Sequence, residues 1–188
     1  PNMEEPNLTL EIDKKDIVAQ SQSGTGKTGS FTIGSLHVID TSQHFTQVII
    51  LAPTRELVKQ IEGVVIGISG VIDNIKIYTL VGGTSVVNDS NYLKKNKPHI
   101  VIGTTGRIYD MINRRHLQTD KLKLLVMDEA DEMLSKGFKE QVHSLFKNFP
   151  DIIIGARRGS PLAVGYSNEE NYLGSDSYAL KSMTNKIS

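Results

Sequence analysis

The chain has no cysteine among its 188 residues. This absence excludes disulfide bonds, thiolate metal sites and a cysteine nucleophile, and it agrees with a cytoplasmic location. No apolar run approaches the roughly 20 residues that a membrane-spanning helix requires, so we expect no membrane partner. The first residues, Pro1–Glu11, contain neither a basic start nor an apolar stretch, and we therefore expect no secretory signal.

An excess of charge of either sign is also lacking. The sequence holds 21 Lys and Arg residues against 21 Asp and Glu residues, which gives a formal net charge of zero. A chain without net charge produces no global field that would attract nucleic acid or an anionic membrane. Any binding of RNA must therefore depend on local groups.

Short apolar runs alternate with helix-like stretches between residues 16 and 150, a pattern typical of βαβ units with a mainly parallel sheet. The expected strands are Ile17–Ala19, Gln47–Ala52, Ile75–Leu80, His99–Ile102 and Leu122–Met127. The expected helices are Lys27–Ile39, Arg55–Ile68, Ser90–Lys95, Ile108–Arg115 and Glu132–Phe149. Right-handed crossovers place the helices on both faces of the sheet, and ligands are expected at the carboxyl ends of the strands.

The composition changes after Pro150. The last part of the chain is rich in Gly, Ser, Asn and Tyr, with strand-like pieces at Ile152–Ile154 and Leu162–Val164. We expect this tail to be poorly ordered because it lacks strand partners, except where Ile152–Ile154 docks onto the parallel sheet. The predicted division is an N-terminal segment (1–15), an α/β domain (16–150) and a tail (151–188).

A glycine-rich segment follows the first expected strand. It reads Ser23-Gly24-Thr25-Gly26-Lys27-Thr28, which matches the end of a P-loop whose usual first glycine is replaced. Backbone N–H groups of such a loop converge on phosphate oxygens, and the next helix presents its positive end to the same anion. Lys27 would reach the outer phosphates of ATP, and the Thr28 hydroxyl would help to hold Mg²⁺. The alternative is a plain turn of small residues.

An acidic cluster, Asp128-Glu129-Ala130-Asp131, ends the last expected strand. A buried strand that delivers carboxylates to its carboxyl end is where an NTPase is expected to hold Mg²⁺. Asp128 would position the metal, and Glu129 would orient or deprotonate the attacking water. The alternative is that the cluster caps the following helix, since anions at a helix start stabilise it by about 0.3–1 kcal/mol.

Taken together, these motifs resemble the first RecA-like domain of DEAD-box RNA helicases over residues 16–149, closest to the translation-initiation-factor type. The same region holds three further motifs of that family, Pro53-Thr54-Arg55-Glu56-Leu57, Gly82-Gly83 and Thr104-Thr105-Gly106-Arg107. The resemblance implies a RecA-like P-loop NTPase sandwich that binds ATP or ADP, Mg²⁺ and a single strand of RNA without reading its sequence. It assigns RNA contacts to Pro53, Thr54, Arg55, Gly82, Gly83, Thr104, Gly106 and Arg107.

The sequence departs from the family pattern at several places. Pro1–Lys15 does not match the family's adenine-reading segment, and Thr105 replaces the usual proline, which is expected to loosen that turn. Gly155-Ala156-Arg157 stands where the family has Ser-Ala-Thr, so the hydroxyl groups that couple ATP hydrolysis to unwinding are missing. We also expect the second RecA-like domain and its arginine finger to be missing, which lowers phosphoryl transfer by a factor of about a thousand or more. The chain is therefore not expected to unwind RNA alone.

Part of the tail resembles a different family. Ile154–Leu162 and Tyr172–Asp176 are similar to the glutaminase domain of glutamine-fructose-6-phosphate aminotransferase. That resemblance implies glutamine binding by Arg157 or Arg158 together with Asp176, but the nucleophile of that family is an N-terminal cysteine, which this chain lacks. Two alternatives to the helicase domain stay open from the sequence: a non-enzymatic module that binds nucleotide or a partner, and an inactive amidotransferase fragment.

Overall fold

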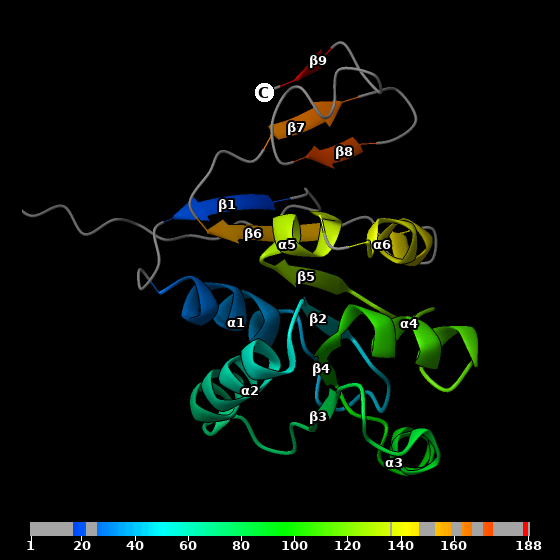
Figure 1. The fold of residues 1–188 in the computed structure, drawn as a ribbon. Coiled ribbons are helices and arrows are strands. Elements are labelled where there is room, and N and C mark those ends of the chain that lie inside the picture. The colour runs from blue at the N-terminus through cyan, green and yellow to red at the C-terminus, as the bar shows by residue number, and fades with distance from the viewer. Residues whose placement is uncertain are drawn as a thin grey trace, which may run out of the picture.

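The computed structural model describes residues 17–21, 26–135, 137–146, 153–158, 163–166, 171–174 and 186–187. Within them, six parallel strands form one sheet in the order β1-β6-β5-β2-β4-β3 (Figure 1). These strands are β1 (Ile17–Ser21), β2 (Val48–Ala52), β3 (Ile77–Leu80), β4 (Ile100–Thr104), β5 (Leu124–Asp128) and β6 (Ile153–Arg158). The predicted α/β architecture with a mainly parallel sheet is confirmed.

The centre of the sheet is β2, which pairs with β5 on one side and β4 on the other. Every residue of β2 is fully buried, as a continuous apolar run covered on both faces requires. Since the six strands are parallel, their last residues lie at the same end of the sheet. We call this end the carboxyl rim, and it consists of the ends of the strands at Ser21, Ala52, Leu80, Thr104, Asp128 and Arg158.

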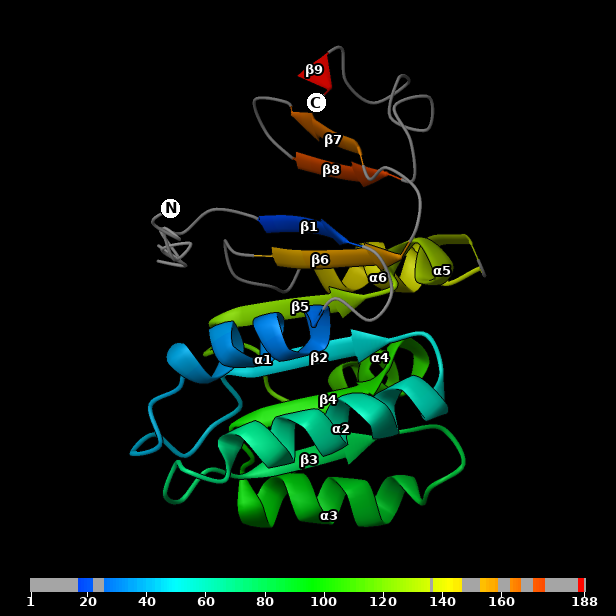
Figure 2. The same ribbon diagram turned by 90° about the vertical axis from the view of Figure 1, so that its left-hand side faces the viewer.

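Helices cover both faces of the sheet. On one face lie α1 (Lys27–His37) and α2 (Arg55–Ser69), side by side in Figure 2. The other face carries α3 (Val86–Asn96), α4 (Thr105–Asn113), α5 (Ala130–Ser135) and α6 (Lys139–Phe146). No helix within the described ranges is long and apolar enough to cross a membrane.

Each face of the sheet has its own apolar core. Alternate residues of β2 point to the two sides, so that Ile50 joins one core and Ile49 the other. The first core includes Phe31 of α1 and Ile61 of α2, and the second includes Ile108 of α4 with further side chains of α5 and α6. The two cores fix the helices whose first turns lie at the carboxyl rim.

One helix prediction is wrong. The structure has two helices, α5 and α6, in the region where the sequence pattern predicts a single helix over Glu132–Phe149. Gly137 lies between them with a φ of 81°, a left-handed conformation that ends a helix and that glycine adopts without strain. Gly137 was therefore the sequence signal for the break between the two helices. Residues 147–149 of the predicted helix lie outside the described residues.

Two other helices begin earlier than the sequence pattern predicts. α3 begins at Val86 because Ser85 caps it, with its Oγ accepting the N–H of Asn88 at 3.4 Å. α4 begins at Thr105, directly after the last residue of β4, although the predicted start was Ile108. Both helices therefore bring backbone N–H groups closer to the carboxyl rim than expected.

The tail contributes one strand to the parallel sheet. Ile153 and Ile154 of β6 pair with Leu125 and Val126 of β5, as the predicted docking of this piece requires. The strands β7 (Ala163–Tyr166), β8 (Asn171–Gly174) and β9 (Lys186–Ile187) form a separate antiparallel sheet. The poor order expected for the tail stays a prediction, since its other residues, like residues 1–16, lie outside the described ranges.

The close packing of β4 can be tested at Gly103. An added Cβ there would overlap the carbonyl oxygen of Leu80 and lie 2.8 Å from Cδ1 of Ile108. We expect Gly103→Ala to lower the free energy of unfolding by about 1–3 kcal/mol in a denaturant titration. The control Gly67→Ala, on the exposed side of α2 with no atom within 4 Å of its Cβ, should raise it by about 0.5–1 kcal/mol. Equal effects of the two changes would contradict the packing.

Candidate functional site

The predicted site residues that the structure describes lie at the carboxyl rim in two groups. The nucleotide motifs follow β1 and β5, which flank β6 in the sheet. The predicted RNA-binding residues follow or end β2, β4 and β3, which are consecutive neighbours in the other half of the sheet. Ser23, Gly24 and Thr25 of the predicted phosphate loop lie outside the described residues.

The end of the phosphate loop is formed by Gly26, which precedes α1. Its φ is 84°, a left-handed conformation that favours glycine, and no side chain caps the helix. The first turn of α1 also contains no acidic residue. A helix start without a side-chain cap or an acidic residue in its own first turn suits a phosphate, because the first N–H groups and the helix dipole favour negative charge.

The acidic motif places two adjacent carboxylates in different surroundings. Asp128 is the last residue of β5 and only 5% exposed, whereas Glu129 is half-buried. The N–H of Glu129 donates to Oδ1 of Asp128 at 3.1 Å, and Glu129 has a φ of 53°. A positive φ is uncommon for a residue other than glycine.

Lys27 and Asp128, from the two nucleotide motifs, act on each other electrostatically. Burial raises the pKa of Asp128, while the hydrogen bond from Glu129 and the positive charge of Lys27 partly offset this effect. Lys27 and Thr28 are both half-buried in the first turn of α1. The fold therefore brings together the lysine of one motif and the carboxylate of the other, which are far apart in the sequence.

Helix capping explains only part of the acidic motif. Asp131 lies in the first turn of α5, where a carboxylate favours the helix dipole, and the Glu129 carbonyl accepts the N–H groups of Glu132 and Met133. Asp128, however, belongs to the strand and is buried. A stabilising role at the helix start therefore fits Asp131 but does not explain why a carboxylate is buried at the end of β5.

The donor atoms near α1 and β5 suit Mg²⁺ in the presence of a nucleotide. Among the described residues, no group of three or more His, Cys, Asp and Glu side chains could hold a metal ion. Mg²⁺ at nucleotide sites commonly uses one or two protein oxygens and takes its other ligands from phosphates and water. The carboxylate of Asp128 and the hydroxyl of Thr28 are hard oxygen donors of this kind.

In the RNA half of the rim, Arg55 lies against a pair of glycines. An added Cβ at Gly83 would lie 2.8 Å from Nη2 of Arg55, and one at Gly82 would lie 3.5 Å away. Gly83 also has a φ of 88°. The conformation of Gly83 favours glycine, and a side chain there would also have to displace the exposed guanidinium of Arg55.

Two threonines of the RNA half end or follow strands. Thr54 caps α2, because its Oγ1 accepts the N–H of Leu57 at 3.2 Å. Thr104 ends β4 and precedes α4 without a side-chain cap, and the first turn of α4 has no acidic residue. α1 shares these features, whereas α2, α3, α5 and α6 each carry an acidic residue in the first turn. Among the described helices, the two that have no acidic residue in the first turn thus begin at the predicted phosphate and RNA sites.

Arg107 has surroundings that the sequence did not reveal. Its side chain is only 9% exposed, its Nη1 lies 2.7 Å from Oδ2 of Asp89, and its Nη2 donates to the carbonyl of Thr84 at 2.8 Å. Tyr78 and Thr84 also donate to Asp89. Sequence reasoning missed Asp89 because an acidic residue in the first turn of a helix gives no sign of its distant partners.

Thr105, where the family usually has proline, has a buried side chain. It is 2% exposed, and its Oγ1 donates to Sδ of Met133 at 3.0 Å. This contact joins the start of α4 to α5. The expected loosening of this turn stays a prediction, and the contact with Met133 acts against it.

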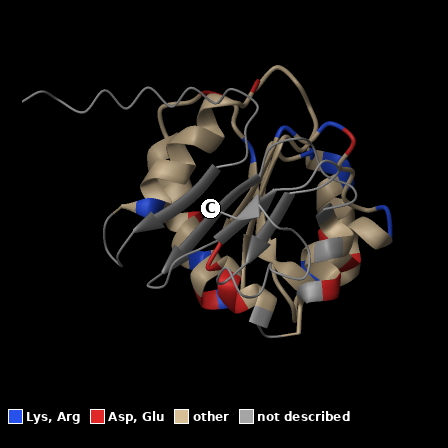
Figure 3. Ribbon diagram, turned by 90° about the horizontal axis from the view of Figure 1, so that it is seen from above, with Lys and Arg blue, Asp and Glu red and all other residues tan. Residues whose placement is uncertain are grey.

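Charges of both signs are distributed over the described residues. Figure 3 shows Lys and Arg interspersed with Asp and Glu on the helices around the sheet. This distribution agrees with the zero net charge of the sequence. Attraction of RNA would therefore have to come from groups at the rim itself.

Residues 6–158 match the DEAD/DEAH box helicase family. The ATP-dependent RNA helicase eIF4A of Lodderomyces elongisporus is 50% identical over 137 residues, which cover 73% of this chain and 34% of that protein. The eIF4A of Emericella nidulans is 51% identical over 139 residues, 74% of this chain and 34% of that protein. The chain thus spans about a third of the length of the curated relatives that it matches.

Solved structures show the same fold. A DEAD box protein from the hyperthermophile Methanococcus jannaschii superposes with a TM-score of 0.72 at 36% identity, covering 78% of this chain and 40% of that one. A variant of S. cerevisiae Dbp5 bound to Nup159, a Gle1 variant, IP6 and ADP superposes with a TM-score of 0.71 at 28% identity, covering 93% of this chain and 42% of that one.

Replacing Thr105 by the family's proline tests how the start of α4 is held. Thr105 is the first residue of the helix, where proline is well tolerated, and the extended backbone of Thr104 suits a residue before proline. The change removes the hydrogen bond to Met133, worth about 0.5–1.5 kcal/mol. We expect Thr105→Pro to change the free energy of unfolding by less than about 1.5 kcal/mol. A loss above about 3 kcal/mol would show that the backbone there cannot accept proline.

The burial of Asp128 makes the stability depend on pH. Because folding raises the pKa of Asp128, the folded chain binds its carboxyl proton more tightly than the unfolded chain does. This difference stabilises the fold at low pH, and the stabilisation is lost as the pH rises through the folded pKa. In metal-free buffer, we expect Asp128→Asn to raise the unfolding midpoint near about pH 7 and to give little gain below about pH 3, where both side chains are neutral. The exposed control Asp73→Asn should show no such difference. A lower midpoint for Asp128→Asn at neutral pH would contradict the dominance of burial.

Proposed function

Because this chain belongs to the DEAD/DEAH box helicase family, we propose that it binds ATP with Mg²⁺ and a single strand of RNA. Within a longer protein, it would couple ATP hydrolysis to the remodelling of RNA duplexes. The observation that carries this proposal is the arrangement of the carboxyl rim, where the nucleotide motifs occupy one half and the RNA motifs the other. Relatives named as ATP-dependent RNA helicases support the assignment.

In the nucleotide half, each residue has a distinct proposed role. Gly26 and the first N–H groups of α1 would bind phosphate oxygens, and Lys27 would bind the outer phosphates. Thr28 and Asp128 would hold Mg²⁺, which when bound neutralises charge on the phosphates. Glu129, more exposed than its neighbour, would orient the attacking water and accept its proton.

In the RNA half, the proposed contacts are to the sugar-phosphate backbone. Arg55 is exposed over the glycine pair, and α4 begins with N–H groups that no side chain caps. Such groups bind phosphates without reading bases, so we propose binding that is independent of sequence. The proposed contact residues are Pro53, Thr54, Arg55, Gly82, Gly83, Thr104 and Gly106.

We propose that this domain alone does not unwind RNA. Ala156 of β6 pairs with Asp128 of β5, so the segment Gly155–Arg157 runs beside the acidic motif at the rim. This segment lacks the two hydroxyl groups that the family places there. The proposed partner for turnover is a second RecA-like domain, which would supply positive charge to the transition state. ATP-dependent unwinding by the isolated chain would refute this part of the proposal.

A calorimetric titration with ADP and Mg²⁺ tests the nucleotide half. We expect saturable binding by the unmodified chain and its loss in Lys27→Ala, because this side chain would contact the phosphates. The control Lys59→Ala removes an exposed positive charge from α2 and should bind as the unmodified chain does. If the folded, unmodified chain bound no ADP, the nucleotide assignment would fail, and a non-enzymatic module that binds a partner would be favoured.

A further inference from the structure

A buried carboxylate joins the loop after β3 to the first turn of α4, both of which carry proposed RNA contacts. The side chain of Asp89, in the first turn of α3, is only 4% exposed. Its Oδ1 accepts the hydroxyl of Tyr78 at 2.8 Å, and its Oδ2 accepts the hydroxyl of Thr84 at 2.9 Å and the guanidinium of Arg107 at 2.7 Å. The donors come from β3, from the loop after β3 and from α4. One carboxylate therefore connects four segments near the carboxyl rim.

The loop after β3 is held from two sides. The Thr84 hydroxyl donates to the carbonyl of Val81 at 3.0 Å, which closes the turn around the glycine pair, and its own carbonyl accepts Nη2 of Arg107 at 2.8 Å. Arg55 lies against the glycines of the same loop. The loop thus lies between two arginines, one exposed and one buried.

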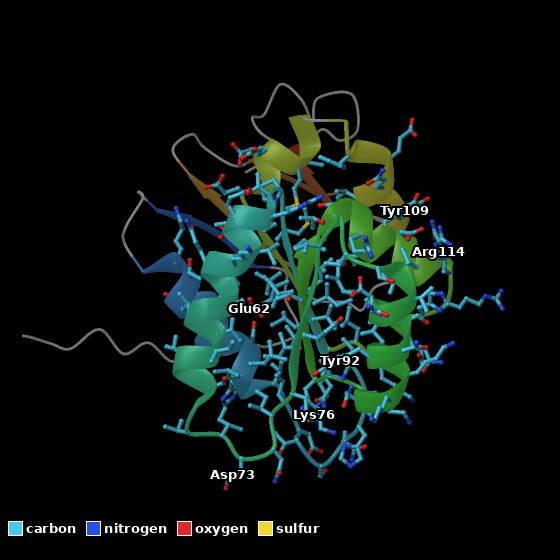
Figure 4. The ribbon with its side chains drawn as sticks, turned by 60° about the horizontal axis from the view of Figure 1, so that its bottom comes forward. Glu62, Asp73, Lys76, Tyr92, Tyr109 and Arg114 are labelled. Atoms are coloured by element: carbon cyan, nitrogen blue, oxygen red, sulfur yellow. The ribbon has the colours of Figure 1, made fainter. Side chains whose placement is uncertain are left out.

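Tyr78, the donor from β3, is packed against a second aromatic ring. The ring of Tyr78 stacks on that of Tyr92, with 3.9 Å between centroids and 11° between planes. Figure 4 shows Tyr92 between α3 and the sheet, on the side opposite to Glu62 of α2. Burial and the hydrogen bond to Asp89 raise the pKa of Tyr78, so its hydroxyl stays a donor at neutral pH.

We propose that Asp89 and Arg107 are positioning residues, which fix the loop of Gly82, Gly83 and Thr84 for RNA, and that Arg107 is not itself a phosphate ligand. The inference rests on the proposed binding of RNA. It differs from the role that the family resemblance assigns to Arg107. Arg55 is then the arginine of this surface that neutralises a phosphate.

The burial of the ion pair is the physical reason. To reach a phosphate, the Arg107 guanidinium would have to leave a carboxylate 2.7 Å away and give up the Thr84 carbonyl. Asp89 would then be a buried charge with only neutral donors, a costly state because its desolvation is no longer offset by a nearby positive charge. Arg55 is exposed beside Gly82 and Gly83, so it can reach a phosphate without leaving a buried carboxylate.

The dependence of RNA affinity on salt separates the two roles. Each phosphate contact to a single strand contributes about 0.7 to the slope of log affinity against log salt concentration. We expect Arg55→Gln to weaken binding of a fluorescent oligouridylate and to lower this slope by about 0.7. Arg107→Lys should weaken binding roughly tenfold, as loss of a supporting contact does, with the slope unchanged. Asp89→Asn should weaken binding as well, but it frees Arg107 from its carboxylate, so the slope is compared for Arg107→Lys alone. Lys keeps the charge of Arg107 but cannot reach two acceptors as a planar guanidinium does.

Amide hydrogen exchange without RNA gives a second readout. Exchange at residues 82–85 should rise in Asp89→Asn and Arg107→Lys and should not change in Arg55→Gln. The control Lys95→Gln, an exposed position in the last turn of α3, should change neither exchange nor RNA affinity. If Asp89→Asn does not fold, Tyr78→Phe removes one donor from the same carboxylate and should show the same two changes at smaller size.

Three outcomes would overturn the inference. A charge-removing variant, Arg107→Gln, that lowers the salt slope by the same amount as Arg55→Gln would make Arg107 a phosphate ligand. Full affinity in Arg107→Lys would show that only its charge matters. No binding of RNA by the unmodified, folded chain would overturn the proposed RNA function, and this inference with it, whereas the first two outcomes leave that function standing.

Discussion

The parallel direction of the six strands is the constraint on which the functional arrangement depends. Strands that run the same way place all their carboxyl ends at one end of the sheet, and β2 keeps its neighbours in register because it is buried on both faces. Motifs that are separated by about a hundred residues in the sequence therefore lie at one rim. In the strand order, the proposed nucleotide site lies at β1, β6 and β5, and the proposed RNA site lies at β2, β4 and β3.

The two halves of the rim are built by different physical means. The proposed nucleotide half relies on backbone groups at the start of α1 and on the carboxylate of Asp128, whose pKa is raised by burial although the positive charge of Lys27 partly offsets this effect. The RNA half has its cation already in place, because Arg107 balances the buried Asp89. A satisfied buried network fixes the shape of a loop at the expense of desolvating two charges. The RNA half is thus shaped by internal polar contacts before any ligand arrives.

The sequence was sufficient for the features that depend on local patterns. Continuous apolar runs indicated buried strands, and Gly26 and Gly83 marked the loops, since both adopt a left-handed backbone conformation that other residues rarely adopt. The break between α5 and α6 was missed although Gly137 signalled it, because the acidic and apolar pattern around it resembles one helix. The network of Asp89 could not be found from sequence, since its donors lie up to 18 positions away and only the fold brings them together.

The most direct test of this arrangement is a comparison of amide hydrogen exchange in the unmodified chain with and without Mg²⁺ and ADP, and with and without a single-stranded oligouridylate. Nucleotide should protect residues 26–30 and 128–132, and RNA should protect residues 54–57, 82–85 and 104–107. Residues 45–47 and 97–99, at the opposite end of the strands, should exchange at the same rate in every sample. Protection at that opposite end, or overlapping protection by both ligands at the same residues, would contradict a rim divided into two halves.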